Sequence, residues 1–154
     1  MTTTTPTARA VVDSFFARFG GADIAGALEL FAERVDFRVG GAANVPWAGR
    51  RGTRQEIADF FAVLGGQLTA AEEFTLHTTV AEGPHVVVLG RSRFGVRATG
   101  RTFTNDFALH ITVTDGLITA YHMYEDSHAI SAAFPPVPAA ADPGAAPGGS
   151  AQGI

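Results

Sequence analysis

One long segment of alternating residues constrains the fold of this chain more than any other feature. In residues 102–114, TFTNDFALHITVT, apolar side chains occupy almost every second position. This spacing predicts a β-strand with one apolar face and one polar face. Asp115-Gly116 follows and is typical of a tight hairpin turn, because both residues tolerate the positive φ angles of such a turn. Residues 117–126 are therefore expected to return as the antiparallel partner strand.

The first third of the chain shows helical spacing instead. Apolar residues lie on one helix face over residues 11–19, and Gly20-Gly21 is expected to end that helix. Asp23 is a typical cap for a second helix, whose apolar face is expected to extend to Phe31. Two helices are therefore predicted before the first strand.

A capping-box pattern marks the third predicted helix. Thr53 and Glu56 form the S/T-x-x-E motif before the apolar run IADFFAVL, and Gly65-Gly66 is expected to close the helix. Residues 35–41 alternate as a short strand before it, and the chain after residue 72 consists of strand-like segments. Three helices followed by a meandering antiparallel sheet predict an α+β fold.

The two ends of the chain differ from the rest in composition. Residues 1–6 are a threonine run closed by a proline, and residues 135–154 hold five of the eight prolines and a single charge. Such segments cannot bury enough apolar surface to offset the entropy of ordering them. We therefore expect disorder at both ends and a single domain over residues 7–134.

The composition excludes several kinds of partner and site. The chain is 46% hydrophobic with a net charge of −4, so nothing draws it as a whole to nucleic acid or to an anionic membrane. No apolar run reaches the roughly 20 residues of a membrane helix. The N-terminus lacks a secretory pattern, so a cytoplasmic location is expected. There is no cysteine, and the five histidines have no metal-binding spacing, so no metal site is expected.

Three stretches of sequence carry a family resemblance. They are the Pro46–Gly49 segment before the third helix, Gly100-Arg101 before the long strand, and the hairpin that ends in Tyr124-x-Asp126. With this order of elements, residues 7–134 resemble the SnoaL-like branch of the nuclear transport factor 2-like superfamily. The resemblance implies a cone-shaped, curved antiparallel sheet wrapped around three N-terminal helices, with one deep apolar pocket. It also implies a homodimer through the outer face of the sheet.

The same resemblance implies a kind of chemistry. The family includes polyketide cyclases, ketosteroid isomerase, limonene-epoxide hydrolase and scytalone dehydratase, which use acid–base side chains in a dry pocket and no cofactor. An enzyme that cyclises, isomerises, dehydrates or opens an epoxide in an apolar cyclic or polyketide/terpenoid-like molecule is therefore expected. The acid that relatives hold on the last strand would fall on Met123 here. A non-catalytic binding or dimeric assembly module is the alternative, which this missing acid favours.

Alternation along the returning strand decides which polar groups can reach the pocket. The alignment with the hydrolase directs Tyr121 and Met123 into the pocket, where they would contact the substrate. Alternation then adds Glu125 to the same face. On this interpretation Glu125 is the general acid or base.

A bulge in the hairpin would give the opposite result. It would turn His122, Tyr124 and Asp126 toward the pocket, and His122 or His110 would then be the catalytic group. Without such a bulge, His110 is expected on the outer face of the sheet, and Asp126 is expected to cap a turn formed by residues 127–130.

Four further residues are candidate substrate contacts. Asn105 interrupts an otherwise apolar strand face and would orient a substrate oxygen, while Phe107 on the same face would shape the cavity. Asn44 corresponds to the segment that supplies a water-positioning asparagine in the hydrolase. Trp47 would stack on a flat ligand at the pocket mouth. Plainer roles stay open, namely a backbone hydrogen bond for Asn105, a core contact for Trp47 and a solvated carboxylate for Glu125.

Overall fold

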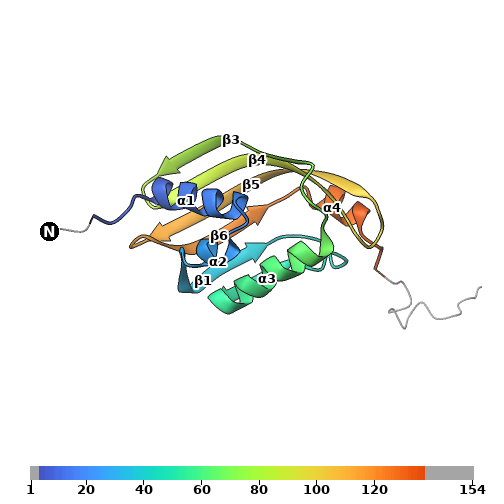
Figure 1. Ribbon diagram of the computed structural model, residues 1–154, viewed down its shortest axis with the longest axis horizontal. Coiled ribbons are helices and arrows are strands. Elements are labelled where there is room, and N and C mark those ends of the chain that lie inside the picture. Colours follow the sequence, from blue (N-terminus) through green and yellow to red (C-terminus); the bar gives the residue numbers. More distant parts are fainter. Residues whose placement is uncertain (1–3, 138–154) are drawn as a thin grey trace, which may run out of the picture.

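The computed structural model describes residues 4–137, which form a mixed α+β domain (Figure 1). Most of the two terminal segments for which the sequence predicts disorder lies outside the described residues. In chain order the elements are α1 (Ala8–Gly20), α2 (Ile24–Leu28), β1 (Phe31–Val39), β2 (Gly49–Thr53), α3 (Arg54–Gln67), β3 (Glu73–Glu82), β4 (His85–Gly95), β5 (Thr102–Thr114), β6 (Leu117–Tyr124) and α4 (Ser127–Ala133).

The six strands form one curved sheet in the order β2-β1-β6-β5-β4-β3. The α+β class is confirmed, and the long hairpin of β5 and β6 lies near the middle of the sheet. The expectation of a wholly antiparallel sheet is wrong at one place, because β1 pairs with β6 in parallel. The chain leaves β1, forms β2, α3 and three more strands, and only then returns beside β1. Alternation within a strand does not reveal such a distant partner.

Three local boundaries differ from the expectations. Phe31 opens β1 instead of extending α2, because β1 pairs there with Ile118 of β6. The short strand β2 was not predicted, since its sequence GRRGT is mostly exposed at the sheet edge and does not alternate. Helix α3 continues through Gly65-Gly66 and ends at Gln67, because Leu68 takes up extended backbone angles.

The predicted helix caps are present. Thr53 Oγ1 accepts a hydrogen bond from the Glu56 backbone N–H at 3.2 Å, and Glu56 Oε1 accepts one from the Thr53 N–H at 3.1 Å. Asp23 caps α2 through the Gly26 N–H at 2.9 Å. Asp126 caps α4 through the Ala129 N–H at 3.1 Å. Each cap satisfies backbone donors that a helix leaves unpaired at its start.

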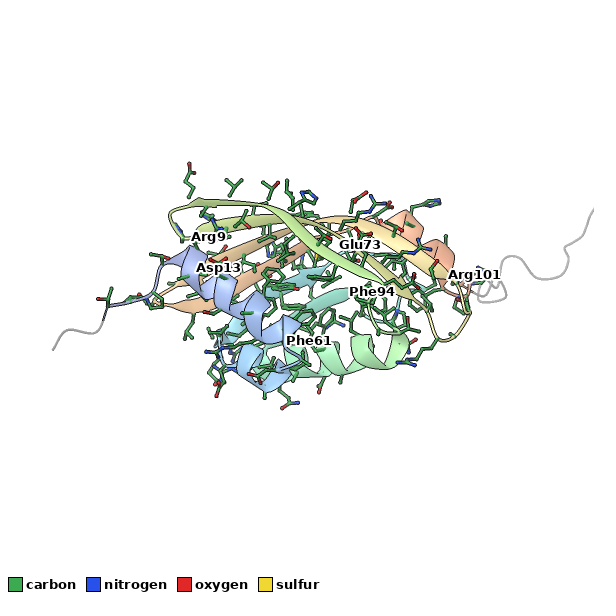
Figure 2. All side chains as sticks on the ribbon, turned by 45° about the horizontal axis from the view of Figure 1, so that its top comes forward. Arg9, Asp13, Phe61, Glu73, Phe94 and Arg101 are labelled. Carbon is green, nitrogen blue, oxygen red and sulfur yellow. The ribbon has the colours of Figure 1, made fainter. Side chains whose placement is uncertain are left out.

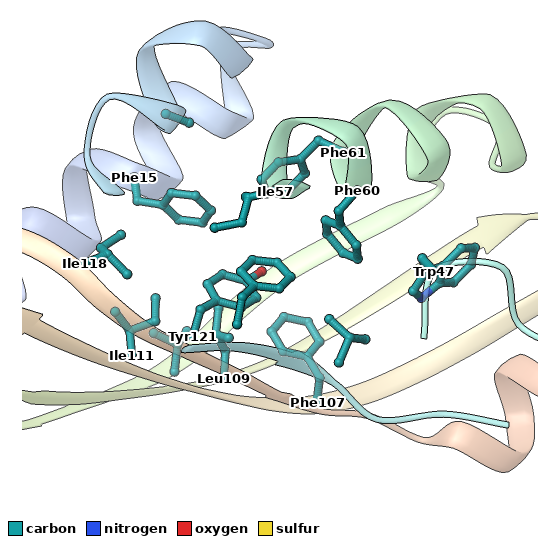
Figure 3. Close-up of a cluster of buried hydrophobic side chains, with 14 of the residues drawn as sticks. Phe15, Trp47, Ile57, Phe60, Phe61, Phe107, Leu109, Ile111, Ile118 and Tyr121 are labelled. Atoms are coloured by element: carbon teal, nitrogen blue, oxygen red, sulfur yellow. The ribbon is translucent and has the colours of Figure 1, made fainter. Parts of the chain in front are cut away.

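The core fills the space between the helices and the inner face of the sheet. Figure 3 shows Phe15, Phe60 and Phe61 reaching from α1 and α3 toward Tyr121 and Phe107 on the strands. The charged side chains of Arg9 and Asp13 on α1 lie on the solvent side, as Figure 2 shows. The aromatic rings form one cluster around the site described next.

Candidate functional site

A pocket, here called the central pocket, lies between α1, α3 and the inner face of the sheet. Its cavity volume is about 80 Å³, which is below the roughly 300–1,000 Å³ of drug-sized ligand sites. Its walls are aromatic and aliphatic side chains: Phe15, Phe16, Phe19, Val39, Trp47, Phe60, Phe61, Leu64, Leu68, Phe74, Phe94, Phe103, Phe107, Met123 and Ile130. Among residues 4–137, four polar residues line it: Ser92, Asn105, Tyr121 and Glu125.

The hairpin bulge that the sequence left open does occur, at Thr119. It lies beside the turn and before Tyr121, so the alternation from Tyr121 onward is undisturbed. Tyr121, Met123 and Glu125 consequently line the central pocket, whereas His122 does not. The bulge produces the register expected from the family comparison, because without it the pairing of Val113 with Ile118 would continue and set Tyr121 opposite His110.

The two candidate histidines lie outside the central pocket, which corrects the alternative interpretation of the site. His110 and His122 are paired across β5 and β6 on the outer face of the sheet. His110 Nε2 lies 3.0 Å from His85 Nδ1, and His122 Nε2 lies 3.1 Å from Asp36 Oδ2. Burial, followed by the neighbouring histidines, lowers the pKa of His110. Neither ring can reach a substrate in the pocket.

This row of outer-face side chains does not make a metal site. Within residues 4–137 there is no group of three or more His, Asp or Glu side chains that could hold a metal ion.

Asn44 also lies outside the central pocket. Its Nδ2 donates to the carbonyl oxygens of Ser131 and Pro135, both at 3.0 Å, and its Oδ1 accepts from Ser131 Oγ at 2.8 Å. These bonds attach the loop before β2 to the end of α4. The water-positioning role expected for Asn44 is therefore wrong, because the residue is occupied in holding α4 in place.

Replacing Asn44 by alanine is expected to lower the free energy of unfolding by about 1–3 kcal/mol, because it breaks three hydrogen bonds and leaves partly buried groups unpaired. Urea unfolding followed by circular dichroism measures the loss. Ser131→Ala removes only the hydroxyl bond and should cost less. An unchanged unfolding midpoint for Asn44→Ala would contradict the anchoring role.

Trp47 is part of the pocket wall. Its side chain is only 2% exposed, and its ring packs edge-on against Phe134 with centroids 5.2 Å apart. It lines the central pocket as expected, but as a buried wall residue and not at an open mouth. Its indole ring can therefore report on anything that enters the pocket.

Asn105 has a fixed orientation in the pocket wall. Its Oδ1 accepts a hydrogen bond of 2.8 Å from the backbone N–H of Asp126, the residue after Glu125. Because an N–H donor requires the oxygen at that position, the Nδ2 end must face elsewhere. Among residues 4–137, Nδ2 has no hydrogen-bond partner, so it is a donor available to a ligand.

Ser92 is a pocket residue that the sequence analysis did not select. It lies on β4 directly opposite Asn105 of β5, on the inner face of the sheet. Its hydroxyl has no hydrogen-bond partner in the described part of the chain. The sequence shows a small polar residue at position 92. Only the register between β4 and β5 reveals that this residue lies beside Asn105 on an apolar surface.

Tyr121 supplies a hydroxyl that stays protonated. Its ring stacks on Phe37 with centroids 4.4 Å apart and an angle of 5° between the planes. Burial, together with the nearby Glu125 carboxylate, raises the pKa of Tyr121 well above its ordinary value. The group is therefore a neutral hydrogen-bond donor at all physiological pH values.

Glu125 is the one charged residue that lines the central pocket among residues 4–137. Burial among apolar walls raises the pKa of its carboxyl from the ordinary value of 4.5 to about 7. No hydrogen bond to the carboxyl occurs within the described residues, so nothing offsets this desolvation. Near neutral pH the acid and the carboxylate are both populated, which suits a group that gives and takes protons.

The protein is an α+β domain whose helices cover one apolar pocket. Among residues 4–137, a single carboxyl lines this pocket. The SnoaL-like domain family matches residues 12–121, so the chain belongs to the SnoaL-like family. No curated protein matches the chain. No helix within residues 4–137 has the length and apolar character needed to cross a membrane.

Several solved structures share the fold. A nuclear transport factor 2-like protein from Burkholderia xenovorans is 27% identical, with a TM-score of 0.74 over 86% of this chain and 100% of that one. A proposed polyketide cyclase from Pseudomonas putida is 15% identical, with a TM-score of 0.68 over 84% and 99% of the two chains. A proposed isomerase from Bacillus subtilis is 22% identical, with a TM-score of 0.68 over 82% and 91%. At these identities the last two show a common fold.

Proposed function

We propose that this protein is a cofactor-independent acid–base enzyme with Glu125 as the general acid and base. Its substrate is an apolar, cyclic or polyketide/terpenoid-like small molecule. The observation that carries the proposal is a carboxyl with a pKa of about 7 in a pocket with otherwise uncharged, largely aromatic walls. Such a group is a stronger base than an exposed glutamate and is still half ionised at neutral pH.

The arrangement suits proton transfer at carbon. The carboxylate of Glu125 removes a proton from a substrate carbon, and the electron pair of the broken C–H bond moves into the substrate. Returning the proton to another atom isomerises the molecule. If the new carbanion first attacks a second carbonyl carbon, the product is a ring. The apolar walls exclude water, which would otherwise quench the intermediate.

The family supports this type of reaction, since structures of the same fold include proposed cyclases and isomerases. The family resemblance places the acid at Met123. The acid of this chain lies two residues further on, just beyond the end of β6, and it lines the same pocket. We propose that Glu125 has taken over that role. A pocket that binds a ligand without turning it over is the competing function, because position 123 itself carries no acid.

Activity is tested with substrates that separate the reaction types. β-Tetralone reports proton exchange next to a carbonyl, followed by NMR in deuterated water, and styrene oxide reports epoxide opening. Exchange or opening faster than in the protein-free solution supports an enzyme. Binding of both compounds at the Trp47 indole signal, with no turnover of either, supports the competing function.

The ionisation of Glu125 gives a prediction that needs no substrate. Carbon-detected NMR of the side-chain carboxyls should show one glutamate that titrates near pH 7, because burial favours its neutral form. The signal should be absent in Glu125→Gln and present in Glu82→Gln, whose side chain is exposed on β3. A midpoint near 4.5 for Glu125 would mean a solvated carboxyl and would remove the basis of the proposal.

A further inference from the structure

The pocket contains a second polar feature besides its carboxyl. Within residues 4–137, Ser92 and Asn105 are the buried polar side chains, 4% and 5% exposed, and both line the central pocket. They are directly opposed across β4 and β5 on the inner face. The Cβ atoms of such a pair are about 5 Å apart, so both side chains can reach one small atom between them.

Both residues present donors to the pocket. Asn105 Oδ1 is bound to the Asp126 N–H, which leaves the two N–H groups of Nδ2 for a ligand. The Ser92 hydroxyl has no partner among the described residues and can donate as well. Within residues 4–137 the one fully buried side-chain atom without a partner is Arg54 Nε, so neither donor is sealed in the core and a ligand acceptor in the pocket can reach both.

We infer that Ser92 and Asn105 together bind one carbonyl oxygen of the substrate, and that the substrate is therefore a neutral ketone that ionises to an enolate. This inference rests on the proposed function of the same pocket and adds the substrate class and the residues that recognise it. Two neutral donors on adjacent strands of the pocket wall favour an oxygen that gains negative charge during the reaction.

The charges around the pocket argue against an anionic substrate. No Arg, Lys or His side chain lines the central pocket among residues 4–137, and the Glu125 carboxylate would repel a carboxylate or phosphate. A ketone enters without charge. It becomes anionic only when Glu125 has accepted a proton and is itself neutral, so the pocket never holds two negative charges.

The donors and the base are fixed relative to each other. The bond from Asn105 Oδ1 to the Asp126 N–H ties the donor pair to the residue that follows Glu125. With the carbonyl oxygen between Ser92 and Asn105, the carboxylate removes a proton from the adjacent carbon. The C–H electron pair becomes the C=C bond, and the carbonyl π electrons move to the oxygen, which the two donors stabilise as an enolate.

Binding tests the inference apart from catalysis. The Trp47 indole N–H, from the only tryptophan in the chain, reports occupancy by β-tetralone and by tetralin, which has the same two rings without the oxygen. The wild type should bind the ketone about tenfold or more tightly than the hydrocarbon, as expected for two hydrogen bonds to one oxygen. Ser92→Ala and Asn105→Asp should lose most of this preference and still bind tetralin.

The substitutions are chosen so that the variant proteins keep the wild-type fold. At a pH where its new carboxyl is ionised, Asn105→Asp keeps the acceptor for the Asp126 N–H and lacks the Nδ2 donor, whereas an alanine would also release the strand end. Ser14→Ala, on α1 and outside the pocket, is the matched control and should keep the preference.

Exchange of the β-tetralone α-protons supplies the second readout. Ser92→Ala should slow it by about 100-fold, the usual effect of losing one donor to a developing oxyanion, with the Glu125 titration unchanged. Equal binding of ketone and hydrocarbon by the wild type, or exchange unaffected in both pocket variants, overturns the inference. If the wild type prefers the ketone because of the two donors but exchanges no protons, the inference holds and the proposed enzyme is refuted. The inference and the proposed function therefore fail by different results.

Discussion

Replacing Glu125 by glutamine is expected to slow α-proton exchange in β-tetralone by about 100-fold or more, the lower end of what a positioned base contributes. Glutamine has the same shape and leaves the pocket walls in place, but its amide cannot take up a proton at neutral pH. NMR in deuterated water measures the rate. Glu82→Gln removes an exposed carboxyl from β3 and should keep the wild-type rate.

The pH dependence of this rate separates a base from a merely polar contact. In the wild type the rate should rise with pH through the pKa of about 7, because only the carboxylate accepts a proton. Glu125→Gln should lose this step as well as the rate. A variant that kept both would exclude Glu125 from the reaction and leave ligand binding as the function of the pocket.

The hairpin and the pocket face of β6 could be predicted because their signals are local. Asp115 and Gly116 adopt φ angles of 52° and 80°, as a turn after an alternating strand requires. Alternation from Tyr121 then places Glu125 on the face of the pocket. The raised pKa could not be predicted from the sequence, since it depends on the apolar walls that α1 and α3 bring to the same place.

The parts that could not be predicted depend on contacts between distant residues. Asn44 resembles a catalytic asparagine in its local sequence, but its partner Ser131 is 87 positions away on a helix that no spacing links to it. Ser92 becomes a pocket residue only through its register with Asn105. The parallel pairing of β1 with β6 likewise joins segments that neither alternation nor turn residues connect.

The two histidines also show that the face of a strand residue depends on how the strands pair. His110 and His122 are attractive catalytic candidates by residue type, and the choice between them and Glu125 depended on one bulge. The bulge exists, and at Thr119 it sets His122 opposite His110 on the outer face. A slip of one residue between β5 and β6 would have exchanged the two faces at the pocket, because successive strand residues point in opposite directions.

The Glu125 carboxyl should also control how the stability of the protein varies with pH. Its pKa is about 7 in the folded chain and close to the ordinary 4.5 in the unfolded one. Between these values the folded state holds a proton that the unfolded state has released, so stability falls as pH rises through this window. The contribution is complete below pH 4.5 and lost above pH 7. At about 1.4 kcal/mol per pKa unit, the loss is at most about 3 kcal/mol.

Glu125→Gln should therefore be more stable than the wild type at pH 8, by up to about 3 kcal/mol, and close to it at pH 4.5. Urea unfolding at both pH values measures the difference. Asp36 and Glu56, whose pKa values are lowered, affect both proteins equally and cancel in this comparison. A difference that does not change with pH would show that Glu125 ionises normally. A variant that gains stability at high pH while losing exchange activity would instead show that the fold tolerates a costly half-buried carboxylate because the reaction needs it.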